Sequence, residues 1–254
     1  MTIKDADASG YVLGLADDAL IYAQRLGEWV ARAPELEEDM ALANVALDLL
    51  GQARALLAHV GRLDGTGRSE DDLAMFRDER DFRCVHLLEQ PVDDFGVEMA
   101  RMLTFATYQS HLYAALRTCA DDVVAGVAAK AVKECAYHRD HAEQWVLRLG
   151  DGTEASHARM QAGLETLAPY VEELFDDDEA SVDAAGAGLG VLPSSLRHAV
   201  LADIATVVGR ASLAMPEPPT WHSRGGRAGI HSEAMGPLLA QMQHIARSHP
   251  GATW

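Results

Sequence analysis

The acids of two apolar helical stretches are the residues of this chain that could do metal chemistry. Residues 39–54 read DMALANVALDLLGQAR and include Asp48, and residues 130–148 read KAVKECAYHRDHAEQWVLR and include Glu134. A carboxylate on the apolar face of a helix needs a partner, and in a helical bundle that partner can be a pair of iron ions. The two stretches therefore predict either a di-iron carboxylate site or the remains of one.

The ligand set of such a site is incomplete in this sequence. A di-iron bundle uses Glu-x-x-His on two helices, so that both side chains project inward. Asp48 is followed three residues later by Gly51, and Glu134 by Tyr137, while His138 lies four residues after Glu134 on the same helical face. We expect a vestigial site, with the acids held by hydrogen bonds or by a lysine. Its positions are Asn44, Asp48, Lys130, Lys133, Glu134 and His138. A functional metal site and ordinary surface residues are the alternatives.

A complete Glu-x-x-His occurs from Glu154 to His157, directly after Thr153. Thr153 is suited to cap a helix, and Glu154 to the positive end of the helix dipole, so we interpret this motif as a helix start, with His157 able to lie in solvent. His138 and His141 could suggest a mononuclear site, but HRDH on a charged helix is typical of a solvated face. The sequence therefore predicts no catalytic residue, metal ligand or cofactor in this chain.

The three cysteines, Cys84, Cys119 and Cys135, are an odd number without a CxxC, which favours neither a disulfide framework nor a zinc finger. Cys119 and Cys135 lie in apolar helical stretches and are expected in the core rather than as nucleophiles. No GxSxG, P-loop or GxGxxG motif follows a strand, so hydrolysis by a serine nucleophile and nucleotide binding have no support.

Composition narrows the classes of partner. The 254 residues include 39 acids and 21 bases, giving a formal charge of −18, which disfavours nucleic acid and anionic membranes because both need clustered Lys and Arg. The N-terminus, MTIKDADASG, is unlike a signal peptide, and we find no run of about 18 uncharged apolar residues. The sequence predicts a cytoplasmic protein.

Apolar residues recur at helical spacing and strand-like alternation is missing, so the predicted class is all-α. Because a short link, a crossover of about 30 residues and a second short link join four long helices, we predict a ferritin-like four-helix bundle. The expected bundle helices are 10–32, 34–61, 93–119 and 121–149, with shorter pieces at 73–76 and 82–88. On the third, Met99, Met102, Phe105, Tyr108 and Leu112 form a packing stripe.

Additional C-terminal helices are expected after the bundle. They span 154–175, 193–214 and 234–247, with an exposed loop at 176–192 and a proline- and glycine-rich arm at 215–229. We predict one ferritin-like domain over residues 1–254, with the core bundle at about 10–150 and the C-terminal helices and arm at about 153–254.

Sequence blocks spread from about residue 25 to the C-terminus carry a family resemblance. They are GEW (27–29), APELEEDMALAN (33–44), LDLLGQAR (47–54), RDER (77–80), EQP (89–91), KECAYH (133–138), RLGDGT (148–153), GIHSEAMG (229–236), LAQMQ (239–243) and PGATW (250–254). On these blocks the chain resembles the C-subunit family of the bacterial phenylacetyl-CoA epoxidase, a multicomponent monooxygenase of aerobic phenylacetate breakdown.

The resemblance implies a non-catalytic, structural subunit with a ferritin-like bundle. It would pair with a homologous catalytic A subunit that holds the di-iron centre and forms the ring 1,2-epoxide of the CoA thioester. Other subunits, including a flavin and iron–sulfur reductase, would complete the complex, and a homodimer of this chain is a further expectation. The rival hypotheses are a metal-binding oxidase in its own right and a helical adaptor unrelated to oxygenases.

Exposed aromatic and arginine side chains are common anchors of protein interfaces. The corner at 27–39, the arm at 223–229 and the last helix are therefore candidate partner surfaces. Their anchors would be Trp29, Trp221, Arg224 and Arg227. The alternative is that Trp29 and Trp221 only plug the ends of the bundle.

Overall fold

The computed structural model describes residues 3–252, and every regular element within that range is a helix. The α-helices are α1 (Ile3–Gly27), α2 (Leu36–Leu63), α3 (Glu70–Met75), α4 (His86–Glu89), α5 (Phe95–Leu116), α6 (Asp122–Gly150), α7 (Glu154–Val171), α8 (Glu179–Gly186), α9 (Arg197–Arg210) and α10 (Met235–Ser248). Short 3-10 helices are η1 (Glu79–Asp81), η2 (Glu172–Phe175), η3 (Pro193–Leu196) and η4 (Gly226–Ala228). The predicted all-α class is confirmed.

The chain forms two compact units, each built from separate segments. Unit 1 comprises residues 1–91, 178–190 and 224–254, and unit 2 comprises residues 92–177 and 191–223. Each unit is described by itself below. The prediction of one domain over residues 1–254 stays a prediction.

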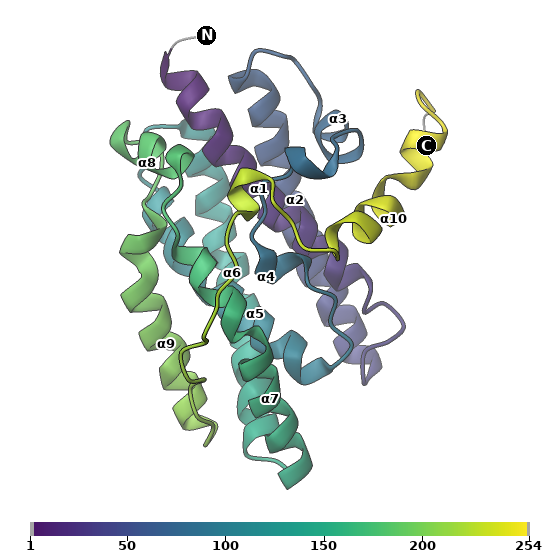
Figure 1. Cartoon of the computed structure of the whole chain (residues 1–254), viewed down its shortest axis with the longest axis vertical. Coiled ribbons are helices and arrows are strands. Elements are labelled where there is room, and N and C mark those ends of the chain that lie inside the picture. The colour runs from purple at the N-terminus through teal and green to yellow at the C-terminus, as the bar shows by residue number, and fades with distance from the viewer. Residues whose placement is uncertain (1–2, 253–254) are drawn as a thin grey trace. The chain divides into compact units, whose positions relative to one another are not determined.

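Unit 1 is organised around α1 and α2, which run side by side (Figure 1). From Ala8 to Leu26, α1 is buried on nearly all sides, while α4 and α8 also pack against it. In contrast, α2 buries one stripe, which includes Leu42, Leu49 and Leu56, and leaves other apolar side chains exposed. The C-terminal α10 packs on α3 and η1. Unit 1 thus contains the first long helix pair and the chain's last helix.

The end of α1 differs from the predicted helix at 10–32. The helix stops at Gly27, and Ala31 adopts a left-handed conformation with φ of 65°. The Ala31 N–H donates to the carboxylate of Asp39 at 2.7 Å, which compensates part of the strain of this conformation. The corner at 27–35 is therefore a defined turn that periodicity alone could not separate from the helix.

Unit 2 is organised around α5, with α6, α7 and α9 packed against it (Figure 1). The predicted packing stripe on α5 is confirmed, because all five of its side chains are at most 2% exposed. Asp121 caps α6 by accepting from the backbone N–H groups of Val123 and Val124, both at 2.9 Å. This tight cap explains why α5 and α6 are joined by so short a link. Unit 2 thus contains a second long pair of helices, α5 and α6, joined by a short link as in ferritin-like proteins.

The predicted exposed loop at 176–192 is wrong, because it contains α8. The Asp178 carboxylate accepts from the Ser181 N–H at 2.6 Å and so caps a helix of eight residues that buries Ser181 and Ala184. The helix ends where the Leu189 and Gly190 N–H groups return to the carbonyl of Ala184. The acid run therefore begins a helix, with Asp178 at its N-cap.

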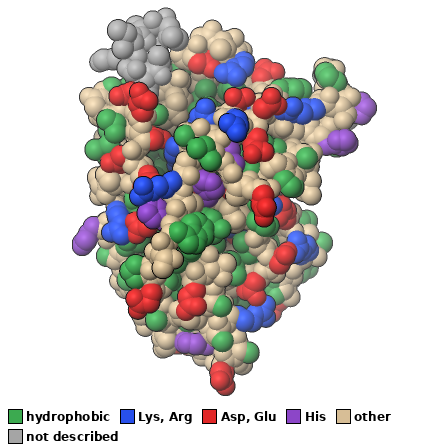
Figure 2. Space-filling model, in the orientation of Figure 1, with side chains coloured by type: hydrophobic (Ala, Val, Ile, Leu, Met, Phe, Trp, Pro, Cys, Tyr) green, Lys and Arg blue, Asp and Glu red, His purple; other side chains and the backbone are tan. Residues whose placement is uncertain are grey.

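Charge and hydropathy add two observations. On the face drawn in Figure 2, acidic side chains are dispersed among basic and apolar ones rather than gathered into one patch. Among the described residues, α2 alone has the length and apolar composition that a membrane-spanning helix needs. Core helices of soluble proteins pass the same test, so this composition is weak evidence for a membrane.

Candidate functional site

The vestigial metal positions of α6 lie along the edge of its buried face. The buried residues of that face follow one another at steps of three or four positions. They are Val124, Ala128, Ala131, Cys135, His138, Ala142 and Val146. His138 is 2% exposed, and the side chain of Glu134 is 12% exposed. The Lys130 ammonium lies 2.5 Å from a carboxylate oxygen of Glu134, one helical turn away, and Lys133 is exposed. The Glu134 carboxylate thus has a lysine partner, as one form of the vestigial-site hypothesis expects.

Tyr137 occupies the position where a second metal ligand would follow Glu134. Its side chain is 52% exposed, and its ring stacks on that of His141 at 6.3 Å between centroids. A phenol directed away from the buried face cannot complete a coordination sphere beside Glu134. The His138 ring meets the Tyr137 ring edge-on, at 6.2 Å and 73°.

The remaining vestigial positions lie on α2, in unit 1, whereas Glu134 belongs to unit 2. Asp48 is half-buried, Asn44 is exposed, and Gly51 provides no side-chain ligand. A di-iron centre needs bridging acids and an imidazole from each of two helices. The residues of α2 and α6 do not fit that requirement, because position i+3 is Gly51 on one helix and the outward Tyr137 on the other. The assignment of all six positions as a vestigial site stays a prediction.

The Glu154-x-x-His157 motif begins α7, as predicted. The Thr153 hydroxyl accepts from the Ser156 N–H at 3.1 Å, and Glu154 is exposed in the first turn. Nδ1 of His157 lies 2.8 Å from the Gly150 carbonyl, so the ring closes the preceding helix end. The Thr153 hydroxyl thus satisfies a backbone N–H at the start of α7, and the His157 imidazole satisfies a backbone carbonyl at the end of α6.

The cysteines lie where an unreactive thiol is expected. Cys84 and Cys135 are buried, and Cys119 is half-buried. Burial is the main cause of a raised pKa at Cys84, where Glu89, Asp17 and Asp18 add to it, and at Cys119. A raised pKa leaves little thiolate at neutral pH, which agrees with a packing role.

Unit 1 contains a buried ion pair that sequence reasoning missed. The Asp17 side chain is fully buried on α1, and Arg77, 5% exposed, donates from Nη1 and Nη2 to its two oxygens at 2.9 and 2.5 Å. The backbone N–H of Arg83 adds a third bond to Asp17 at 2.8 Å. Gln243 on α10 donates to the carbonyls of Ala74 and Arg77. The crossover between α2 and α5 is thereby fixed to both α1 and α10.

The neighbouring Asp18 pairs with the proline- and glycine-rich arm. Arg227 donates to the two oxygens of Asp18 at 3.0 and 2.6 Å, and to the carbonyls of Gly14 and Arg83. Burial raises the pKa of Asp18 to about 6, against the opposing effect of Arg227. Since this value is below 7, the carboxylate is ionised at neutral pH. Arg227, predicted as a partner anchor, is thus bonded within unit 1.

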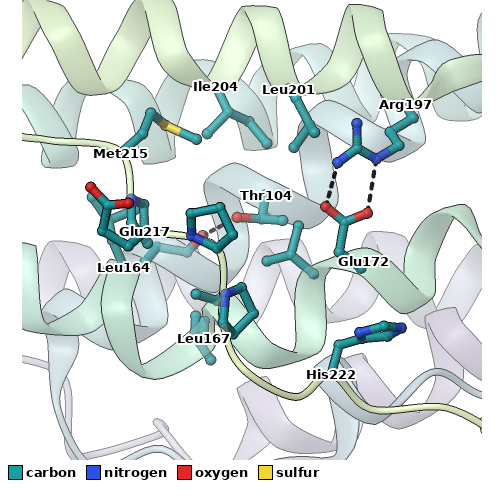
Figure 3. A pocket seen from close by; sticks show the side chains of 16 residues that line it. Thr104, Leu164, Leu167, Glu172, Arg197, Leu201, Ile204, Met215, Glu217 and His222 are labelled. Atoms are coloured by element: carbon teal, nitrogen blue, oxygen red, sulfur yellow. Dashed lines mark hydrogen bonds and ion pairs between the residues drawn. The ribbon is translucent and has the colours of Figure 1, made fainter.

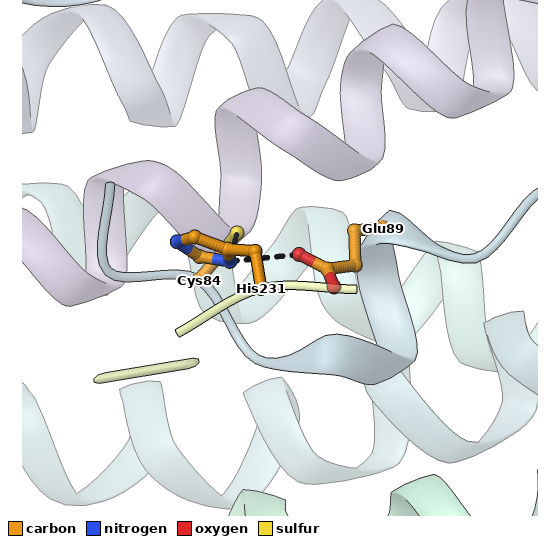
Figure 4. Close-up of side chains that lie close together, drawn as sticks. All are labelled: Cys84, Glu89 and His231. Carbon is orange, nitrogen blue, oxygen red and sulfur yellow. Dashed lines mark hydrogen bonds and ion pairs between the residues drawn. The ribbon is translucent and has the colours of Figure 1, made fainter. Parts of the chain in front are cut away.

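A third cluster brings together Cys84, Glu89 and His231 (Figure 4). Their side-chain ligand atoms lie within 4.8 Å of one another, which is close enough for a metal ion. However, Nδ1 of His231 is 2.8 Å from a Glu89 oxygen, and its Nε2 is 3.1 Å from the carbonyl of Phe82. Both ring nitrogens therefore already lie within hydrogen-bond distance of an oxygen of the protein. The Ser232 N–H also donates to Glu89 at 2.6 Å.

Each buried carboxylate of this network has a partner of its own. Asp17 pairs with Arg77, Asp18 with Arg227, and Glu89 with His231 and the Ser232 N–H. These contacts bind distant segments together. The two side chains of each pair are 60 to 209 residues apart in sequence, so no local pattern signals the network.

Unit 2 holds an apolar cavity of about 400 Å³. Leu164 and Leu167 of α7, Leu201 and Ile204 of α9, and the strap Met215–Pro219 line it (Figure 3). At one side, Arg197 donates to the two oxygens of Glu172 at 2.8 and 2.6 Å, and this contact lowers the pKa of Glu172. The guanidinium is therefore already engaged by Glu172, while Glu217 and His222 are the other ionisable residues of a lining that is otherwise mostly apolar.

A second missed pair lies within α5 of unit 2. Glu98 is fully buried, and Arg101, one turn later and 1% exposed, donates to it through Nε at 3.3 Å and through Nη2. The i,i+3 spacing of opposite charges was visible in the sequence, but so was the possibility of a surface pair. Only the burial of the whole helix shows that this pair is internal.

The other predicted partner anchors differ in exposure. Trp29 is 5% exposed, with Arg32 placed 5.9 Å from its ring centre, which agrees with the packing alternative. Trp221 is 54% exposed and meets the Tyr170 ring edge-on, and Arg224 is exposed. Their use in an interface stays a prediction.

These features define an all-α, ferritin-like protein in which the buried acids Asp17, Asp18, Glu89 and Glu98 have basic partners and the di-iron ligand set is incomplete. The chain belongs to the phenylacetic acid catabolic protein family, whose model matches residues 2–254. It is similar to the C subunit of the 1,2-phenylacetyl-CoA epoxidase of Escherichia coli (strain K12), with 41% identity over 246 residues, covering 97% of this chain and 98% of the relative. The predicted family resemblance is confirmed.

Proposed function

We propose that this chain is the structural, non-catalytic subunit of a phenylacetyl-CoA 1,2-epoxidase, in which it stabilises a homologous di-iron A subunit. The similarity over nearly the full length to a protein named as the C subunit of such an enzyme supports membership in the complex. The observation that carries the non-catalytic role is the pairing of Glu134 with Lys130, one turn from an outward Tyr137. An ammonium group neutralises the acid that a metal would otherwise need.

The chemistry of the complex belongs to the partner in this proposal. A di-iron centre in the A subunit activates oxygen and transfers one atom to the aromatic ring of the CoA thioester, with electrons from a separate reductase. The present chain contributes buried area and holds its neighbour in shape. We propose a cytoplasmic location, since the chain is similar to a subunit of an enzyme that is named for a CoA thioester substrate.

Reconstitution with the companion A subunit tests this proposal. We expect the two chains to co-purify, and the A subunit alone to lose activity or stability when this chain is omitted. A Glu134→Gln variant should leave the epoxidation rate within about twofold of the wild-type complex. A rate lost together with iron from this chain would favour the alternative, an oxidase with its own metal. Failure of the two chains to associate would favour the adaptor alternative.

A further inference from the structure

An apolar seam runs along the exposed side of α2 in unit 1. It consists of Leu36, Met40, Ala43, Leu47 and Leu50, which we call the α2 seam. Leu36, Met40, Leu47 and Leu50 are 72%, 62%, 64% and 38% exposed. The steps between successive members are four, three, four and three residues, which is the spacing with which one helix packs along another.

The exposure of this seam is unusual for so apolar a helix. Only 39% of the most apolar 18-residue window of α2 is buried. Single exposed apolar side chains are common, but a continuous row of them marks an interaction surface. Val30, in the corner before α2, is 54% exposed and extends the apolar surface. The row is therefore a candidate surface for binding a partner that is not part of unit 1.

A groove beside the seam has the form of a hole for a protruding side chain. It has a volume of about 310 Å³ and is formed between α1 and α2. Small residues line much of it, namely Ala23 and Gly27 on α1 and Ala43 and Ala46 on α2. A Cβ atom added at Gly27 would meet nothing within 4 Å, so the space there is open. A large apolar side chain of a second helix fits such a hole, as in knobs-into-holes packing.

Negative charge at the start of the seam favours some binding partners over others. Glu35 and Glu37 are exposed on either side of Leu36 in the sequence, and the whole chain has a formal charge of −18. These acids repel an anionic lipid surface. They also disfavour a second copy of this chain aligned in parallel, because the same acids would meet. They favour a partner helix with Lys or Arg beside its apolar row.

We propose that the α2 seam docks an amphipathic helix of the companion epoxidase subunit, with an apolar row in the groove and basic side chains opposite Glu35 and Glu37. This inference rests on the proposed function and assigns its interface to a surface that begins in the predicted partner corner at 27–39 and continues along α2 beyond it. Leu47 is the most exposed of the seam residues that line the groove, so it is the expected anchor.

Binding of purified chain variants to the companion A subunit tests the proposal. Leu47→Ala should weaken the complex roughly thirtyfold, and Leu47→Glu should abolish it, because both remove the expected apolar anchor. Val182→Glu on α8 is the matched control, since Val182 is 48% exposed but lies outside the seam and outside the predicted partner surfaces, and it should bind like wild type. Circular dichroism should show the same thermal midpoint for the Leu47→Ala chain as for wild type.

The outcomes separate the two proposals. If wild-type chain and A subunit do not associate, the proposed function fails and the docking assignment falls with it. If they associate and Leu47→Glu binds as tightly as wild type, the function stands and the seam assignment is overturned. The assignment is also overturned if Leu47→Glu only converts a homodimer of this chain to monomers, or only prevents flotation with phosphatidylglycerol vesicles, while the complex is unaffected.

Discussion

Replacement of Asp17 by Asn should strongly destabilise unit 1. The carboxylate of Asp17 is fully buried and receives two bonds from Arg77, which is itself 5% exposed and lies 4.1 Å from the centre of the Phe82 ring. The amide keeps the shape but removes the charge, and leaves the guanidinium buried without its counter-ion. Breaking one side of a buried pair costs about 3–5 kcal/mol. For a chain of this size, the thermal midpoint should fall by roughly 6–20 °C.

Urea unfolding followed by circular dichroism measures this effect. The control is Arg54→Gln, which removes a surface pair with Glu70 in which the Arg54 side chain is 66% exposed; its cost should be below about 1 kcal/mol. The double variant Asp17→Leu with Arg77→Met should recover much of the loss, because it removes both charges together. An Asp17→Asn chain within about 1 kcal/mol of wild type would refute our account of the buried network.

Three further outcomes are expected. His231→Ala should lower the thermal midpoint equally with and without EDTA, because Glu89 and a backbone carbonyl hold the ring; stoichiometric bound metal in the wild-type chain would contradict this. Burial raises the pKa of Asp18 to about 6 from its ordinary value of 3.8, so the folded state binds this proton more tightly than the unfolded state does. Wild type should therefore lose about 2 kcal/mol of stability relative to Asp18→Asn as pH rises from 4 to 6, and only about 0.4 kcal/mol more above pH 6. The same pH dependence of the free energy of unfolding in wild type and Asp18→Asn would contradict this prediction. In the native chain, a thiol reagent should modify Cys119 before Cys84, because Cys84 is fully buried and its pKa is raised further; equal rates would contradict this order.

Much of the helical framework could be predicted because its signals are local. The helix start after Thr153 follows from a side chain that caps a backbone N–H three residues away. The short link before α6 similarly follows from Asp121. Pro34 and the acids after it indicated the start of α2, which begins at Leu36. In each case the residue that fixes the boundary lies within four positions of it.

The candidate site was less predictable because its decisive contacts are distant in sequence. Burial made Asp17 and Asp18 part of an ion network, yet on sequence alone they are two acids in a helix that could have faced solvent. Arg227 was predicted as an anchor for a partner protein, whereas the carboxylate that it binds lies 209 residues away in the same chain. The contact between Glu134 and Lys130 could be predicted, since the two residues are one helical turn apart. The exposure of Leu47 could not be predicted, because periodicity describes an apolar face of a helix without saying what covers it.

The pairing of Asp18 with Arg227 has a consequence for synthesis of the chain. The acid leaves the ribosome 209 residues before the guanidinium that neutralises it, and Glu89 similarly precedes His231 by 142 residues. At ordinary elongation rates, the longer interval lasts on the order of 10–40 s. During that time α1 carries the Asp18 carboxylate, and α4 the Glu89 carboxylate, without the partner that each has in the folded chain. The final compaction of unit 1 must therefore wait for the last few dozen residues, which makes the C-terminal segment the closing step of maturation.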